Sequence, residues 1–533
     1  MFVLALSPIL WLVLALSVIK MAAWKACLIA LAISLAVGMG VWDMESIRAI
    51  ESVLEGVALA CWPILLVIVA AIFTYNLTLH TKAMDTIKDM LTSVSHDKRV
   101  LILLIGWGFG GFLEGMAGFG TAIAVPAGML AGIGINPILS VSVCLIANSV
   151  PTAYGSIGIP LVTLSSVTGF DSVTLATFTS LQLGVLTLLC PWLMVIVTGG
   201  GLKGLRGMTM FCLGAGLAFF IPELALSMFV GPELAVVAGA ICTMGTIVFI
   251  AKKFPVNDPE FAMSDQAHAK ITTAQGINAC LPFILIFIFL LFTSKLVPPI
   301  NSFLMQFKSA VPIYNGEGGA PYTFVWINTP GVLILLASFI AGSKQGASFG
   351  EMFGVLKKTV NGLKFTMVTI IAVIATAKVM GYSGMTGQIA DTAVAATGAA
   401  YPLIAAFLGS VGTYITGSAT SSCVLFGKLQ VIASQAIGAN ETVQAWVAAA
   451  NATGACAGKM ISPLSIAIGS AAIGVKGADS QLLAFAVKIY IPFVIFMGAV
   501  VYFGQAIIGR FDENLYKDGR QRLDKSLHGR ASR

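Results

Sequence analysis

The stretch Leu281-Pro-Phe-Ile-Leu-Ile-Phe-Ile-Phe-Leu-Leu-Phe292 is unbroken apolar sequence, inside a segment, 276–297, whose one charged residue is Lys295. A helix needs about 20 mostly apolar residues to cross a bilayer. Comparable segments recur at roughly 2–19, 21–42, 57–79, 172–198, 208–228, 232–251, 325–342, 364–382 and 482–508. The sequence therefore predicts an all-α polytopic membrane protein.

The composition supports this fold class. Of 533 residues, 58% are hydrophobic and 10% are charged, whereas soluble domains carry about 25% charged residues. Such a chain is stable only where lipid solvates its apolar side chains. The formal net charge of +7 comes from short basic clusters between apolar runs, which is typical of juxtamembrane loops. We expect a lipid bilayer around the protein and no nucleic-acid partner.

The sequence indicates no cofactor site and no set of catalytic residues. The nine cysteines form no CxxC motif, and nearly all of them lie in apolar runs, where cysteine behaves as a small hydrophobe. His80, His96, His268 and His528 lack metal-ligand spacing. The sequence contains no GxxxxGK[ST] loop, HExxH motif or nucleophile elbow. We therefore expect no metal, no cofactor and no enzymatic activity.

Two less regular apolar regions, 100–165 and 385–475, are rich in glycine and interrupted by polar residues. Counting their pieces gives about 12–14 membrane passes. Each region lies late in one half of the chain, which predicts two inverted repeats with broken helices or re-entrant hairpins. The expected units are 1–251 with the hairpin at 100–165, a cytoplasmic or connecting loop at 252–275, 276–509 with the hairpin at 385–475, and a basic cytoplasmic tail at 510–533.

Basic residues between the apolar segments bear on orientation. They occur in the connectors 80–99 and 199–207, and the tail 510–533 has seven basic residues against four acidic ones. Because basic residues favour the cytoplasmic side, the tail is predicted to be cytoplasmic. The connector 298–324 has few basic residues and is a candidate for the outer face.

Similar motifs occur in the two irregular regions. Gly118-Phe-Gly-Thr121 precedes Ala147-Asn-Ser-Val-Pro-Thr152, and Gly417-Ser-Ala-Thr-Ser-Ser422 precedes Ala450-Asn-Ala-Thr-Gly454. Broken helices free backbone groups that must face protein, water or a ligand, and a helix N-terminus favours an anion. Packing glycines and interhelical hydrogen bonds are the alternative interpretation. The candidate substrate-binding residues are Gly118, Gly120, Thr121, Asn148, Thr152, Tyr154, Thr420, Ser421, Ser422, Asn451, Thr453 and Lys459.

Two charged residues stand beside the broken segments. Lys459 is a candidate partner for a substrate carboxylate, and Glu114 is a candidate proton carrier. Charges at mid-membrane are costly and persist when they have a partner or a function. A structural ion pair between the two is the alternative. Lys378 and Asp391, which flank 381–385, are weaker candidates, with Asp391 as a second possible proton-coupling group.

These motifs resemble a known family. Glu114-Gly-Met-Ala-Gly-Phe-Gly-Thr121 resembles the EGxAGFG stretch of bacterial L-lactate permeases, and the segment 146–160 is similar to their asparagine-proline segment. The segments 416–422 and 458–465 are similar to two later signatures. The resemblance spans nearly the whole chain, with four motifs in register. It implies a proton-coupled importer of L-lactate, glycolate or a related 2-hydroxy monocarboxylate in the bacterial plasma membrane.

The sequence departs from the family at Ala419, where members carry aspartate, and at Cys423, where asparagine is common. If the aspartate carries the coupled proton elsewhere, Glu114 becomes the leading proton candidate here. The expected mechanism holds the carboxylate on Lys459 and the N–H groups of the hairpins. Asn148, Asn451 or nearby hydroxyls would read the 2-hydroxyl group.

Three alternatives remain open at this point. A sodium-coupled carrier of another organic carboxylate would use the plentiful backbone carbonyl and Ser, Thr and Asn oxygens. A membrane-embedded enzyme and a channel are less favoured. The sequence does not indicate the oligomeric state.

Overall fold

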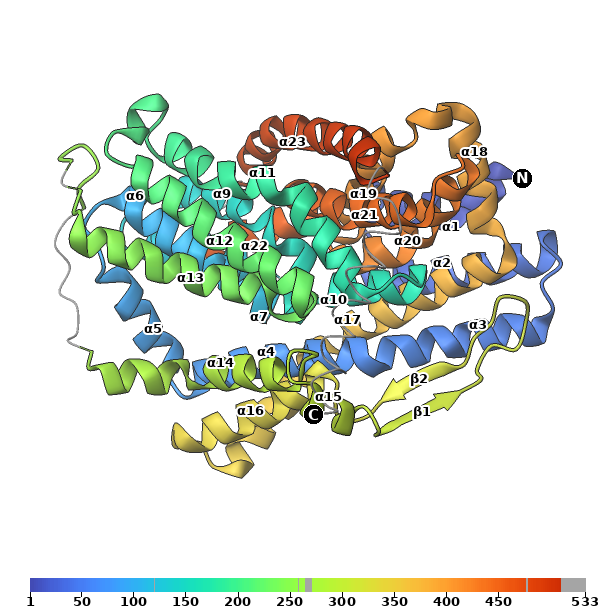
Figure 1. Ribbon diagram of the computed structural model, residues 1–533, viewed down its shortest axis with the longest axis horizontal. Helices are drawn as coiled ribbons and strands as arrows, with labels where there is room; N and C mark the ends of the chain where they lie inside the picture. Colours follow the sequence, from blue (N-terminus) through green and yellow to red (C-terminus); the bar gives the residue numbers. More distant parts are fainter. Residues whose placement is uncertain (119, 257, 264–270, 476–477, 510–533) are drawn as a thin grey trace, which may run out of the picture.

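The computed structural model describes residues 1–118, 120–256, 258–263, 271–475 and 478–509, and it is almost entirely helical (Figure 1). In this part of the chain, nine helices are long and apolar enough to cross a membrane. They are α2 (Ala23–Val41), α3 (Ser46–Leu59) continuing into α4 (Leu66–His80), α6 (Lys98–Leu101) continuing into α7 (Gly110–Met116), α11 (Ser172–Thr198), α12 (Thr209–Phe229), α13 (Pro232–Lys253), α14 (Thr273–Thr293), α17 (Phe349–Ser383) and α23 (Ala478–Ile508). The predicted all-α polytopic membrane protein is confirmed.

Two further spans are bent, and both lie in the irregular regions. The first joins α9 (Pro137–Asn148) to α10 (Gly155–Thr168) with a bend of 62°. The second joins α21 (Glu441–Ile461) to α22 (Pro463–Ile473) with a bend of 45°. The predicted broken helices are thus present in both halves of the chain.

Shorter helices complete the bundle. They are α1 (Phe2–Val13), α5 (Ala83–Thr92), α8 (Thr121–Gly132), α15 (Pro298–Leu304), α16 (Pro330–Lys344), α18 (Met385–Thr397), α19 (Pro402–Thr416) and α20 (Ala419–Ala436). With each bent pair taken as one span, the described residues give up to eleven candidate crossings. Some of the shorter apolar helices would supply the remainder of the 12–14 passes expected from the sequence.

The break between α9 and α10 has a local chemical cause. Pro151, which has no N–H, begins a short 3₁₀ turn, Pro151–Tyr154. Ser156, Ile157 and Gly158 follow with φ of +49°, +59° and +74°. Left-handed backbone is uncommon for a β-branched residue, so Ile157 stores local strain where the helix restarts.

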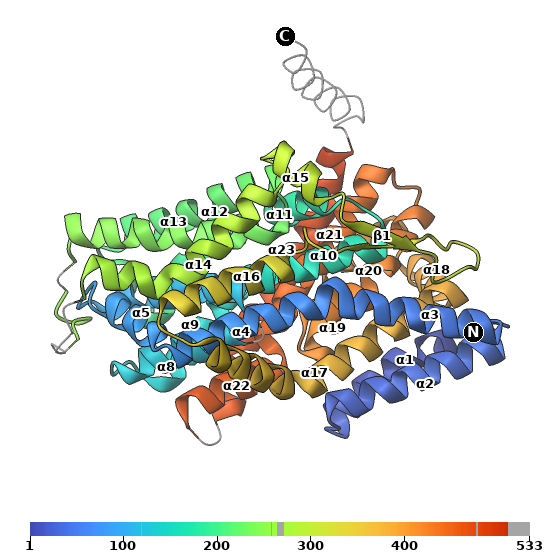
Figure 2. The ribbon, with the colours of Figure 1, turned by 90° about the horizontal axis from the view of Figure 1, so that it is seen from below.

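The two halves of the chain pack into one body. α8 packs against α22, α10 against α20, and α11 against α21. α4 packs against α16 and α17, and α14 against α16, along the lower edge of the molecule in Figure 1. The two hairpin regions therefore meet each other rather than forming separate domains (Figure 2).

Some features were not indicated by the sequence. α3 and α17 begin well before the apolar runs at 57–79 and 364–382. The early start of α17 has a capping box, in which the Ser348 hydroxyl accepts the Glu351 N–H and the Glu351 carboxylate accepts the Ser348 N–H. The connector at 298–324 leads into an antiparallel hairpin of β1 (Lys308–Val311) and β2 (Tyr322–Val325). The tail 510–533 lies outside the described residues.

Candidate functional site

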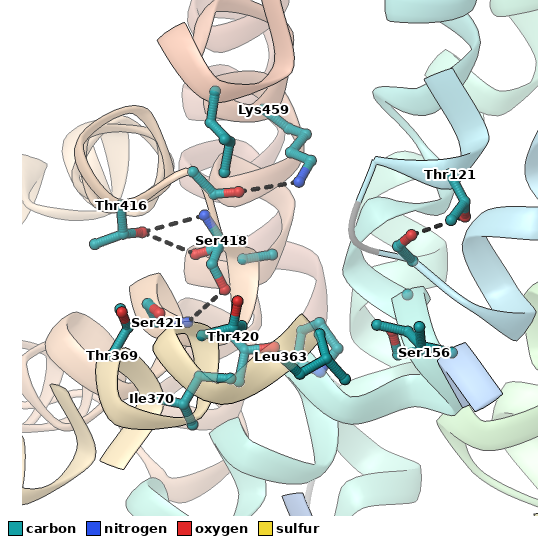
Figure 3. Close-up of a pocket in the computed structure, with 18 of the residues that line it drawn as sticks. Thr121, Ser156, Leu363, Thr369, Ile370, Thr416, Ser418, Thr420, Ser421 and Lys459 are labelled. Carbon is teal, nitrogen blue, oxygen red and sulfur yellow. Dashed lines mark hydrogen bonds between the residues drawn. The ribbon is translucent and has the colours of Figure 1, made fainter. Parts of the chain in front are cut away.

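A cavity of about 600 Å³ lies where the two hairpin regions face α2, α4 and α17 (Figure 3). Its polar lining includes seven of the residues predicted from the sequence: Glu114, Gly118, Thr121, Thr152, Thr420, Ser421 and Lys459. Lys459 and the start of α20 lie on one side of it, and Thr121 and Ser156 lie on the other. Residues that are far apart in the sequence therefore share one pocket.

The N-terminus of α20 opens onto this cavity. Ser418 caps the helix, with its hydroxyl accepting the Ser421 N–H at 3.3 Å. The Thr416 hydroxyl accepts the Ser418 N–H at 3.2 Å. The N–H groups of Ala419 and Thr420, in the first turn, have no acceptor among the described residues. Unpaired N–H groups and the positive end of the helix dipole together suit an anion.

Lys459 lies in the last turn of α21 and points toward the start of α20 (Figure 3). Its side chain is 6% exposed, and its ammonium donates to the Gly417 carbonyl at 3.0 Å. A lysine ammonium has three donors, so this bond leaves donors for a ligand. Lys459 is the one basic side chain among the described residues that line the cavity.

Glu114 lies near the end of α7 and is the one acidic side chain in the described lining. Its carboxylate is close enough to Lys459 for the two charges to interact, yet no N–O distance between them falls within 4.0 Å. One oxygen, Oε2, has no hydrogen-bond partner. The direct structural ion pair is therefore absent in this conformation, and each charge can meet a ligand.

Asn148, the last residue of α9, lies beside Glu114. It is 2% exposed, and both polar atoms of its amide lack a geometrically acceptable partner. Buried polar groups without partners are rare and costly. Asn148 is not itself in the cavity lining, but its amide stands behind the Glu114 carboxylate.

The loop before α8 depends on two glycines. Gly118 and Gly120 have φ of +61° and +86°. A Cβ atom on Gly118 would lie 2.4 Å from the Ser156 hydroxyl oxygen, which donates to the Ala117 carbonyl at 2.7 Å. Glycine therefore permits both the left-handed turn and the contact with the restart of α10.

Other predicted residues lie outside the cavity. Asn451 contacts Gln430 and Ser422, the Ser422 hydroxyl donates to the Gly409 carbonyl, and Thr453 donates to Gln182. The Tyr154 hydroxyl donates to the Ala176 carbonyl. Gly120 shapes the turn before α8, and Asp391 is exposed on α18. Lys378 pairs with Glu55, with 2.5 Å between Nζ and Oε1.

Further lining residues come from helices that looked uniformly apolar. α4 supplies Tyr75 and Asn76, and α17 supplies Thr366 and Thr369. The sequence features that could have indicated these residues are a polar pair inside the run 57–79 and two threonines one turn apart in 364–382. Ala419 also lines the cavity, whereas Cys423 is buried outside the lining. An alanine here leaves Glu114 without a second carboxylate in the described wall.

A family model described as L-lactate permease matches residues 1–508. An L-lactate permease of Streptococcus iniae is 44% identical, over 85% of this chain and 94% of that protein. An L-lactate permease of Escherichia coli K12 is 32% identical, over 92% and 94% of the two chains. Glycolate permease GlcA of the same organism is 32% identical, over 93% and 94%. The crystal structure of the Alcanivorax borkumensis YdaH transporter aligns at 12% identity with a TM-score of 0.34, over 76% of this chain and 85% of that one.

Proposed function

Because the chain belongs to the L-lactate permease family, we propose that it imports L-lactate, glycolate or a related small 2-hydroxy monocarboxylate together with a proton. It is a multi-pass membrane transport protein of a family of permeases rather than an enzyme. The proposed location is the cell inner membrane, with the basic tail in the cytoplasm.

The observation that carries this proposal is the pairing of Lys459 with the N-terminus of α20 across a small space. The ammonium and the Ala419 and Thr420 N–H groups offer donors to one carboxylate. Hydrogen bonds to charged groups contribute about 1.5–3 kcal/mol each. The predicted hydroxyl residues that line the cavity, Thr121, Thr152, Thr420 and Ser421, are candidates to bind the 2-hydroxyl group of a monocarboxylate placed there.

Proton coupling follows from the charge of the substrate. A 2-hydroxy acid has a pKa near that of aspartic acid, about 3.9, so it is an anion at neutral pH. Moving one negative charge inward against a negative-inside potential costs about 2.3 kcal/mol per 100 mV. Symport with one proton removes this cost. In the proposed cycle, the substrate carboxylate forms an ion pair with the Lys459 ammonium, and Glu114 binds the proton.

Uptake into proteoliposomes tests the anion site. Lys459→Ala is expected to weaken L-lactate binding by about 1.5–3 kcal/mol, roughly 10–100-fold, because one charged donor is removed. Lys428→Ala is the matched control, since Lys428 is exposed on the same helix, α20, as the proposed anion-binding turn. Wild-type affinity in the Lys459 variant would remove this residue as the carboxylate anchor.

The same assay tests the driving ion. Wild-type protein is expected to accumulate L-lactate when a pH gradient is imposed, with no requirement for sodium. Glu114→Gln is expected to abolish pH-driven accumulation and to change the KM for L-lactate, because Glu114 shares the cavity with Lys459. Accumulation driven by sodium without a pH gradient would instead support a sodium-coupled carrier.

A further inference from the structure

Glu223 is a buried carboxyl group outside the cavity, and it lies inside an apolar span in which the sequence predicts no site. It belongs to α12 and is 0% exposed. Its Oε1 accepts a hydrogen bond from the Ser180 hydroxyl at 3.3 Å, and its Oε2 has no partner. No lysine, arginine or histidine of the described chain forms an ion pair with it.

The Ser180 hydroxyl that donates to Glu223 is one of three hydroxyl groups in contact with one another. Ser180 Oγ lies 2.5 Å from the Tyr154 hydroxyl and 2.9 Å from Ser227 Oγ. Ser180, Ser227, Tyr154 and Glu223 are called the Glu223 cluster below. The titratable groups that sense the charge of Glu223 are Tyr154 and Cys456. Neither is a cation, so nothing in the described surroundings neutralises an ionised Glu223.

The Glu223 cluster is connected to the cavity by the break between α9 and α10. Tyr154 is the last residue of the turn Pro151–Tyr154. Thr152, in the same turn, lines the cavity, and Gly155 approaches Glu114 so closely that a Cβ atom would lie 2.7 Å from Glu114 Oε1. One short segment therefore contacts Glu114 on one side and, through the Tyr154 hydroxyl, contacts Ser180, the donor to Glu223, on the other.

An isolated carboxylate is costly in the interior of a membrane protein, and hydroxyl donors reduce that cost. A movement of the break would carry the Tyr154 hydroxyl with it and change the hydrogen bonds of Ser180, whose hydroxyl donates to Glu223. We infer that Glu223 is a second proton-binding site, which gains and loses its proton as the break between α9 and α10 changes conformation. Only a proton moves in this step: the carboxylic acid gives it to water and becomes a carboxylate, and the reverse step restores it.

This inference rests on the proton symport proposed above, and the experiment separates the two. Purified wild-type protein in proteoliposomes is first tested for accumulation of L-lactate under an imposed pH gradient. For one proton per anion, a gradient of about one pH unit supports roughly tenfold accumulation. A wild-type protein that shows no such accumulation would contradict the proposed function, whatever Glu223 does.

Given a coupled wild-type protein, Glu223→Gln is the decisive variant. It is expected to keep counterflow of labelled L-lactate and an unchanged KM, because Glu223 lies outside the cavity lining. It should lose pH-driven accumulation and the proton uptake that accompanies L-lactate entry. Glu223→Asp, which keeps a carboxyl group, should recover part of both. If Glu223→Gln accumulates L-lactate like the wild type, Glu223 is a structural residue and the inference is wrong.

Tyrosine variants supply the matched control. Tyr154→Phe is expected to weaken coupling, because it removes the hydroxyl that joins the break to the Glu223 cluster. Tyr401→Phe removes another buried hydroxyl, which donates to Gln430 Oε1 at 2.8 Å, and should leave coupling intact. Equal effects of the two changes would contradict the assigned role of Tyr154.

A measurement on the unmodified sequence covers the case in which Glu223→Gln does not fold. Dicyclohexylcarbodiimide, an apolar reagent, reacts with protonated carboxyl groups. Wild-type protein in vesicles is treated with it at several pH values, with and without L-lactate, and digested peptides are analysed by mass spectrometry. Labelling of Glu223 that changes with pH and with L-lactate is expected. Labelling that is absent, or insensitive to both, would overturn the inference.

Discussion

Asn148 places an entire side-chain amide in the protein interior beside Glu114, at a geometry that forms no proper hydrogen bond. An unsatisfied buried polar group costs about 1–3 kcal/mol of folding free energy. Because no hydrogen bond offsets this cost here, we expect the amide to be paired in another conformation of the protein. In that conformation, Glu114 or the substrate would accept the amide N–H.

Asn148→Ala therefore has opposite expected effects on stability and transport. The free energy of unfolding should stay the same or rise by about 1 kcal/mol, because the unpaired amide is removed. The rate of L-lactate uptake should fall. Thermal denaturation in detergent and initial uptake rates in vesicles measure the two effects. A destabilised variant with full uptake would show that the amide is structural.

Gly118 is expected to tolerate no side chain. Gly118→Ala combines left-handed backbone, which costs about 1–2 kcal/mol for an L-residue, with a clash against Ser156 Oγ. Gly134→Ala is a matched control, because Gly134 has φ of +97° with open space around it. Both variants should lose stability in thermal denaturation, but only Gly118→Ala should lose transport. Equal transport by the two would remove the contact with Ser156 from the mechanism.

At this scale the sequence was informative where a charge interrupted a glycine-rich motif, as at Glu114 and Lys459. It was uninformative for Glu223, because a single glutamate inside a good apolar span carries no pattern. It also could not separate Thr121, which lines the cavity, from Asn451, which packs against Gln430. Which face of a helix a polar residue occupies depends on its packing partners.

At the scale of elements, α19 and α21 approach each other very closely. A Cβ atom on Gly454 would lie 1.8 Å from the Ala406 carbonyl oxygen, and one on Gly458 would lie 2.1 Å from that of Ser410. Small residues four apart allow helix backbones to come together in this way. This contact sets the position of Lys459, the residue after Gly458.

Gly454→Ala is thus expected to push α21 away from α19. Overpacking of this kind costs about 1–3 kcal/mol, and it should lower both thermal stability and the affinity for L-lactate. Gly362→Ala is the control, since Gly362 is a helical glycine with no atom within 4 Å of its added Cβ. That variant should be neutral or slightly stabilised. Unchanged affinity in Gly454→Ala would mean that α21 adapts without moving Lys459.

The broken helices were predictable because proline, glycine and small hydroxyl residues act locally. The early starts of α3 and α17 were not. The added turns of α17 begin at the Ser348 capping box and pack against α4, whose Asn76 amide donates to the Thr359 hydroxyl, and α3 packs against α17. Helices held by such tertiary contacts extend beyond any apolar pattern. The hairpin of β1 and β2 is similarly held, with the Trp62 indole donating to the Val325 carbonyl at 2.8 Å.

At the scale of the whole molecule, the basic connector 199–207 and the end of α23, which the basic tail follows in the sequence, lie toward opposite ends of α11. Arg99 donates to the carbonyls of Gly204 and Arg206, beyond the C-terminal end of that helix. The end of α23 lies instead at Trp446, whose indole donates to Val501 and whose ring contacts Phe178, near the beginning of α11. If α11 crosses the membrane, the connector 199–207 and the end of α23 lie on opposite sides. Only one of them can follow the positive-inside tendency.

Cysteine labelling measures this arrangement. In a variant with its native cysteines replaced, one cysteine is placed in the tail and another at Lys203. A membrane-impermeant maleimide should label the first only in inverted vesicles if the tail is cytoplasmic, and the second only in intact cells. Labelling of both from the same side would contradict the path of α11 through the membrane.

The cavity is larger than the proposed substrate, so the set of acids that bind can be wider than the set that is transported. A volume of about 600 Å³ is in the range of pockets that hold drug-sized ligands, about 300–1,000 Å³, and a three-carbon acid occupies only part of it. A cavity of this size does not exclude larger acids at entry, so we expect discrimination by size at a later step of the proposed transport cycle. Bulky aromatic 2-hydroxy acids are therefore expected to bind at Lys459 without being transported. Such analogues of the proposed substrate would act as inhibitors of the carrier.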